Sequence, residues 1–191
     1  MNYIANCHRF LGCLKKETKG TSAIEFALIF PILILVYFGL VEISNSLEVK
    51  RKVENAANLT GMLVAQAEAV DADFMTNVYK ASKMAFEPLD VAPLKVRISS
   101  VFRELQNDGS FINKVAWSDG DGLTALAVGS VLNPPDNILG DNRGIIVTEV
   151  EYKYARILPE TSFTDFFPSG DIVFTRTFWA HPRYVISIPF Q

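Results

Sequence analysis

The strongest pattern along the chain is an uninterrupted apolar run near its N-terminus. Residues Phe26 to Val41 contain no Asp, Glu, Lys, Arg or His. The longer stretch from Thr21 to Val41 has 21 residues; as a helix it would be about 31 Å long, close to a hydrocarbon core of about 30 Å. Because the run is apolar on every face, it is not typical of a core helix in a soluble protein. The pattern therefore predicts a transmembrane helix over residues 21–43.

A helical period continues after this span without a break. The apolar positions that recur every three or four residues are Leu47, Val49, Val53, Ala56, Ala57, Leu59, Leu63 and Val64. This spacing predicts an amphipathic helix that continues the span. A second helix is expected to start after an N-cap at Asp71 or Asp73 and to end before Pro88. Together they predict a helical stalk over 44–90.

From Leu94 the hydrophobic period changes to two, which is typical of strands. Leu94, Val96, Ile98, Ser100 and Phe102 are expected to share one side. Strands are predicted over 94–102, 111–117, 145–158 and 171–180, with an edge strand over 183–188. Asn107, Asp108 and Gly109 form a hairpin-turn signal between the first two strands. Residues 118–144 read mostly as loop, with a short helix over 124–131. The sequence thus predicts an α+β protein whose antiparallel sheet domain covers 91–191.

Charge is distributed unevenly along the chain. The first 20 residues carry four basic side chains against Glu17, or +3, and the remaining 171 carry 14 basic and 20 acidic ones, or −6. A basic leader over 1–20 before an apolar span predicts that the N-terminus stays in the cytoplasm and that the C-terminal domain is exported. No dense basic patch with interleaved aromatic residues is present, so nucleic acid is not an expected partner.

The apolar run is open to a second interpretation as a cleaved secretory signal. It is longer than the usual apolar core of such a signal, and Ile43 to Ser46 resembles a cleavage site only weakly. A retained signal-anchor in the membrane is the favoured interpretation. The two cysteines, Cys7 and Cys13, both lie in the leader. They are expected to be reduced thiols in the cytosol, and their spacing is poor for a metal site.

Glu25 is the one charged residue just inside the apolar run. A charged carboxylate at the membrane centre would cost about 2.5–3.5 kcal/mol; near the cytoplasmic end it costs less. Its side chain could simply reach the interface or be protonated, or it could need a partner. Pro31 removes one backbone hydrogen bond from the same helix, and it is either a tolerated membrane proline or a kink that shapes packing.

The residues around Glu25 resemble the sequence motif of a known family. Gly20, Thr21, Ser22, Ala23, Ile24, Glu25 and Phe26 are similar to the processing site of type IV prepilins, where a basic leader ends in Gly and Glu follows as the fifth residue. Gly20, Ala23 to Ala27 and Pro31 further resemble the N-terminal motif of the TadE-like family, pseudopilins of tight-adherence (Flp) pilus systems. Residues 145–159 and 171–183, which end in Pro182-Arg183, resemble the close of these proteins more weakly.

The resemblance implies a function and a maturation step. A prepilin peptidase of the bacterial inner membrane would cut between Gly20 and Thr21. Glu25, followed by Phe26, would then pair with the freed amine of Thr21 on a neighbouring subunit. Partners would be other Tad pilins and pseudopilins, and no cofactor is implied. The tail beyond Arg183 and the long leader depart from the family pattern.

Residues with catalytic potential are sparse. His181 is the only histidine after the span, and no P-loop, nucleophile elbow or HExxH motif is present. Asp119 and Asp121, or Asp136 and Asp141, could bind calcium, but Asp-Gly turns explain the same letters. Late aromatic residues could form the core of the sheet or an exposed docking patch; they are Phe163, Phe166, Phe167, Phe174, Phe178, Trp179 and Tyr184.

We therefore expect a non-enzymatic pilus assembly protein, a minor pseudopilin of a Flp/Tad pilus that acts by helix packing. The rival interpretation is a membrane-anchored periplasmic binding or enzymatic domain whose span serves only as a tether.

Overall fold

A computed structural model describes residues 19–106, 109–135, 138, 140, 143–156 and 170–191. Its elements follow the order α2 (Lys19–Ala65), α3 (Ala72–Phe86), β1 (Leu94–Leu105), β2 (Phe111–Asp121), β3 (Gly144–Tyr154) and β4 (Ile172–Ala180). The chain divides into two compact units, residues 1–44 and 45–191. The predicted α+β class is confirmed, with a long apolar helix, a second helix and then an antiparallel sheet.

Helix α2 is continuous over 47 residues and runs through Pro31. The prediction that one helix continues beyond the apolar run is therefore confirmed. Helix α3 begins as expected after Asp71, whose carboxylate accepts a hydrogen bond from the Phe74 N–H at 2.7 Å. It ends at Phe86, ahead of Pro88.

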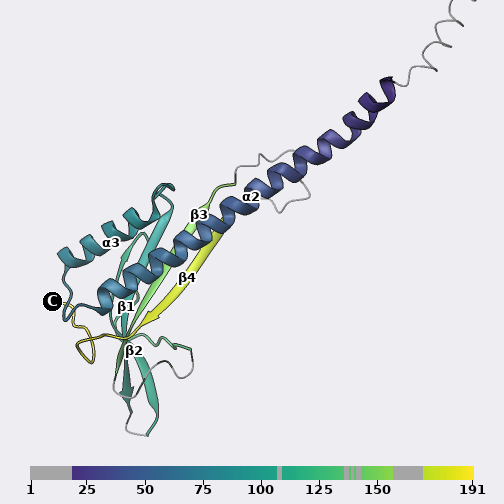
Figure 1. Cartoon of the computed structure of the whole chain (residues 1–191). Helices are drawn as coiled ribbons and strands as arrows, with labels where there is room; N and C mark the ends of the chain where they lie inside the picture. The colour runs from purple at the N-terminus through teal and green to yellow at the C-terminus, as the bar shows by residue number, and fades with distance from the viewer. Residues whose placement is uncertain (1–18, 107–108, 136–137, 139, 141–142, 157–169) are drawn as a thin grey trace, which may run out of the picture. The chain divides into compact units, whose positions relative to one another are not determined.

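The four strands lie in the order β2-β1-β3-β4, and all three pairings are antiparallel (Figure 1). Their positions agree with the four strands predicted from the period of two. Gly109 has the positive φ of 82° that the hairpin signal predicted; Asn107 and Asp108 lie outside the described residues.

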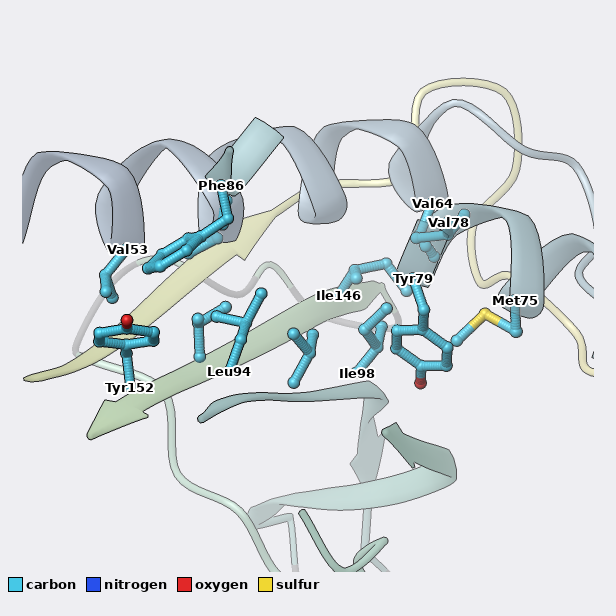
Figure 2. Packing of buried hydrophobic residues seen from close by; sticks show 14 of the residues in the cluster. Val53, Val64, Met75, Val78, Tyr79, Phe86, Leu94, Ile98, Ile146 and Tyr152 are labelled. Carbon is cyan, nitrogen blue, oxygen red and sulfur yellow. The ribbon is translucent and has the colours of Figure 1, made fainter. Parts of the chain in front are cut away.

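The main core lies between the sheet and the helices of the second unit (Figure 2). Val53 of α2 and Phe86 of α3 face Leu94 and Tyr152 on the strands, and the rings of Phe86 and Tyr152 are 4.6 Å apart. Further buried side chains come from Val49, Ala56, Ala57 and Val64 on α2 and from Met75, Val78 and Tyr79 on α3. The amphipathic stripe of α2 thus buries its apolar side against the sheet.

A second, smaller core lies on the opposite face of the sheet. It contains Val101, Val115, Ile145 and Val147. Leu126, Leu132 and Ile138 pack against it from the segment that follows β2. The short helix predicted over 124–131 is therefore wrong, because this segment covers the sheet as an extended loop. The prediction of loop from residue 118 is also wrong at its start, since β2 continues to Asp121.

The C-terminal tail forms no strand over 183–188, so that prediction is wrong as well. Instead, backbone and side-chain bonds tie it to several elements. The Arg183 N–H donates to Ala65 O at 2.9 Å, and the Gly144 N–H donates to Ile186 O at 2.8 Å. The buried indole N–H of Trp117 donates to Ile188 O at 2.6 Å. The tail is a strap that joins the end of α2 to two strands.

Candidate assembly surface

The residues singled out for processing and assembly all lie in the first two turns of α2. Gly20 and Thr21 follow directly after the first helical residue, Lys19. Among the described residues, nothing lies within 4 Å of where a Cβ atom at Gly20 would be. Gly20 and Thr21 are both exposed, so no other part of the described chain covers the peptide bond between them.

Glu25 lies one helical turn after Thr21, so the two residues share a side of α2. The Glu25 side chain is exposed and has no ion-pair partner within the ranges that the structure describes. Its neighbours Ile24 and Phe26 are 64% and 60% exposed. The structure therefore places a single carboxylate in an apolar surface, but it does not bring that carboxylate to a cation of its own chain.

The apolar surface around Glu25 extends along the whole first part of α2. Every residue from 20 to 38 is exposed, and the large apolar ones include Leu28, Ile29, Phe30, Ile32, Leu33 and Tyr37. The rings of Phe26 and Phe30 lie one turn apart, with centroids at 5.2 Å and planes tilted by 30°. Within the described residues, α2 is the one helix long and apolar enough to cross a membrane. This is consistent with a single membrane span.

The comparison with known families adds evidence on this helix. Residues 20–60 match the model of the family described as TadE-like protein. The chain carries a TadE-like domain. The domain begins at Gly20 and ends at Thr60, so it covers both the apolar run and part of the helix that packs on the sheet. No curated protein and no solved structure matches the chain significantly.

A TadE-like domain implies a Tad pilus assembly protein, from a family that is generally non-enzymatic and whose partners are expected among Tad pilus components. The match does not extend to residues 145–159 or 171–183, so the weaker resemblance of the C-terminal strands stays a prediction.

The acidic residues considered for calcium instead join β2 to α3. The Tyr79 hydroxyl donates to the Asp119 carboxylate at 3.1 Å, and Lys83 pairs with Asp121. Burial, reinforced by Asp119, raises the pKa of the Tyr79 hydroxyl above its usual value. Among the residues that are described, no cluster of three or more His, Cys, Asp or Glu side chains could hold a metal ion. Asp136 and Asp141 lie outside them.

His181 is exposed and lines a hollow with Arg143, Arg183 and Tyr184, and the described lining includes no carboxylate. Among the late aromatic residues, some belong to the core of the sheet and one is exposed. Phe174 and Phe178 pack against the main core and Trp179 against the second one, whereas Tyr184 is 69% exposed. Phe163, Phe166 and Phe167 are outside the described ranges.

Gly61 is a structural residue of α2 that the sequence analysis did not single out. A Cβ atom there would lie 2.5 Å from the Phe178 ring and 3.0 Å from Thr148 Oγ1. Gly61 thus lets α2 approach β3 and β4 closely. A lone glycine at an inward position of a helix was the available signal.

Proposed function

We propose that the protein is a minor pseudopilin of a Flp/Tad pilus, which acts by packing its apolar helix against those of other pilins. The observation that supports this most is an apolar helical surface, exposed on every side, that carries one carboxylate inside a TadE-like domain. Lipid or neighbouring helices are the environments that such a surface requires.

Glu25 and Thr21 provide the specificity in this proposal. Hydrolysis of the Gly20–Thr21 bond by a prepilin peptidase leaves a carboxylate on Gly20 and an ammonium group on Thr21. The ammonium group of one subunit and the Glu25 carboxylate of another then neutralise each other in apolar surroundings. Neither charge is favourable alone in apolar surroundings, so the pair stabilises the one axial register in which the two groups meet. Phe26 packs beside this pair.

In the proposed topology the basic leader stays in the cytoplasm, and the domain after the span faces the periplasm. The protein would then be extracted from the inner membrane into the pilus or remain at its base. Either position keeps the apolar helix among other apolar helices or lipid tails.

The principal experiment replaces Glu25 by alanine in cells that make the pilus. We expect pilus production to fall to background while the protein remains at its normal level in the membrane. Glu48→Ala is the matched control, because it removes an exposed acid from the same helix beyond the apolar run. Normal pili with Glu25→Ala would contradict the proposed role of the carboxylate.

A second experiment separates this function from the rival tether. Residues 26–41 are replaced by an unrelated leucine-rich sequence, with Glu25 retained. The pseudopilin proposal expects loss of piliation, since specific helix packing is removed. Full retention of function would show that the span serves only as an anchor.

Maturation is tested separately by mass spectrometry of protein from native membranes. We expect the mature chain to begin at Thr21, and Gly20→Val to leave it unprocessed. An intact Met1 in the native protein would refute cleavage and with it the charge pairing, but not the helix packing.

A further inference from the structure

The two edges of the sheet are treated differently by the chain. At the outer edge of β2, the Val115 N–H donates to Ser130 O at 2.9 Å and the Leu132 N–H donates to Asn113 O at 3.1 Å. The Gly129 N–H donates back to Val115 O at 2.8 Å. The backbone of residues 129–132 therefore covers this edge, which is a common protection of an edge strand.

The hydrogen-bond directions of β3 show which groups of β4 point outward. The Gly144 N–H is directed away from β1, to Ile186, while Arg143 O accepts from Arg103 on β1. Directions alternate along a strand, so the even-numbered residues of β3 bond to β4. Their partners are Ile172, Phe174, Arg176, Phe178 and Ala180.

It follows that the odd-numbered residues of β4 direct their N–H and C=O groups outward. These are Val173, Thr175, Thr177 and Trp179. Within the ranges of the chain described by the structure, no backbone bond is made to them from outside the sheet. The opposite edge of the sheet, in contrast, is covered.

The composition of β4 favours pairing with a further strand at its outer edge. Its nine residues, IVFTRTFWA, are mostly β-branched or aromatic and include no proline. Arg176 is its single charged side chain, is exposed and forms no ion pair with any described residue. Phe174 and Phe178 lie two residues to either side, on the same face as Arg176.

We propose that the outer edge of β4 binds an extended segment of another protein, which adds as an antiparallel strand and carries an acidic residue between two apolar ones. The outward backbone groups provide the hydrogen bonds of strand addition. The acid faces Arg176, and the apolar residues two positions away face Phe174 and Phe178. This surface belongs to the domain after the span and does not depend on Glu25 or on cleavage.

The occupant is not expected to be β4 of a second copy. The antiparallel register that pairs Phe174 with Phe178 across two copies centres on Arg176. It would place two arginines directly opposite each other, and like charges in such a pair are destabilising. Arg176 thus disfavours pairing of β4 with β4 of a second copy and favours pairing with a strand that carries an acidic residue.

The test uses the full-length protein in detergent micelles and two fluorescent nine-residue peptides. One peptide has the β4 sequence with glutamate in place of the central arginine, and the other retains arginine. We expect fluorescence anisotropy to show tighter binding of the glutamate peptide by about fivefold. Arg176→Glu should reverse this preference without disturbing the β3–β4 ladder.

A backbone variant tests the geometry of the edge. Thr175→Pro removes an outward N–H and spares the bonds to β3, so the glutamate peptide should bind about tenfold more weakly. Thr175→Val is the control, because it keeps the N–H and should bind normally. Equal affinity for both peptides, or unchanged binding by Thr175→Pro, would overturn the proposal. Tighter binding of the arginine peptide would overturn the proposal in favour of self-association. If Thr175→Pro fails to fold, the peptide preference of Arg176→Glu still tests the proposal.

Discussion

The two parts of α2 have the same backbone structure but opposite relations to the rest of the chain. From residue 20 to 38 all side chains are exposed, although most are apolar. Beyond Ser44, Val49, Val53 and Ala56 are buried, while Lys50 and Arg51 face outward. The second part is rich in good helix formers. The first part is rich in Ile and Phe, and a helix suits it because an apolar environment requires its backbone groups to bond within the segment.

The difference shows where each part finds its stabilising contacts. The second part has a single apolar side, and the sheet covers it. The first part is apolar all round, so its surface must be covered by lipid or by other helices. Substitutions in the two parts should therefore affect different properties: stability of the domain in one, membrane insertion and assembly in the other.

The largest effect on this comparison is expected from Phe86→Ala. Phe86 is fully buried and packs on Tyr152, so its loss should reduce the free energy of unfolding by about 3–5 kcal/mol. Urea denaturation, followed by tryptophan fluorescence in detergent, measures the change. Phe30→Ala in the first part of α2 is the control and should leave the domain's unfolding midpoint unchanged. A midpoint shift of similar size in both variants would show that the two parts are not independent.

A glycine pair provides the next effect. Gly61→Val forces methyl groups against Phe178 and Thr148, and should cost about 1–3 kcal/mol of unfolding free energy. Gly20→Val places the same side chain in open space and should cost nothing measurable by thermal denaturation. Equal stability of Gly61→Val and the native protein would disprove the close approach of α2 to the sheet.

A smaller effect is expected at the contact between α3 and β2. Tyr79→Phe removes the hydroxyl that donates to Asp119 and should cost about 1 kcal/mol near neutral pH. Because the pKa of Tyr79 is raised in the folded state, its stabilising contribution is present below pH 10 and is lost as the pH rises beyond it. Stability curves between pH 8 and 11 should fall less steeply for the variant. Identical slopes would contradict the buried tyrosine; Tyr152, whose pKa burial also raises, contributes equally to both curves.

The smallest effect concerns Asp121, which pairs with Lys83 at the surface. Asp121→Asn should lower the unfolding free energy by less than about 1 kcal/mol, because the pair is solvated. The difference should shrink further in high salt. A loss of several kcal/mol, or a dependence on added calcium, would instead indicate that this carboxylate binds a metal ion.

Much of the fold could be predicted from the sequence because its patterns are local. The apolar run and the spacing of Val49, Val53 and Ala56 predicted one long helix, and Asp71 and Pro88 marked the limits of the next. The alternation from Leu94 onward predicted the strands. The candidate site lies in a continuous motif, so Gly20 and Glu25 could be proposed without any tertiary information.

What could not be predicted depends on contacts between distant segments. Residues 124–131 have apolar spacing compatible with a helix, but Leu126 packs on a second sheet face that the alternation of β1 did not reveal. The run Ile145 to Val147, apolar on both sides, was the one local sign of that face. Gly120 is similar: the Leu123 carbonyl oxygen lies only 2.2 Å from where its Cβ would be, and no sequence pattern indicates this contact.

The C-terminal strap has a consequence for how the protein is made. Among the described residues, the Val70 N–H, the Gly144 N–H and the Trp117 indole N–H donate to carbonyls of the strap, those of Pro189, Ile186 and Ile188 respectively. A growing polypeptide therefore cannot satisfy these groups until residues 186–189 have left the ribosome. The nascent domain should stay loosely closed, and sensitive to proteases, until that moment.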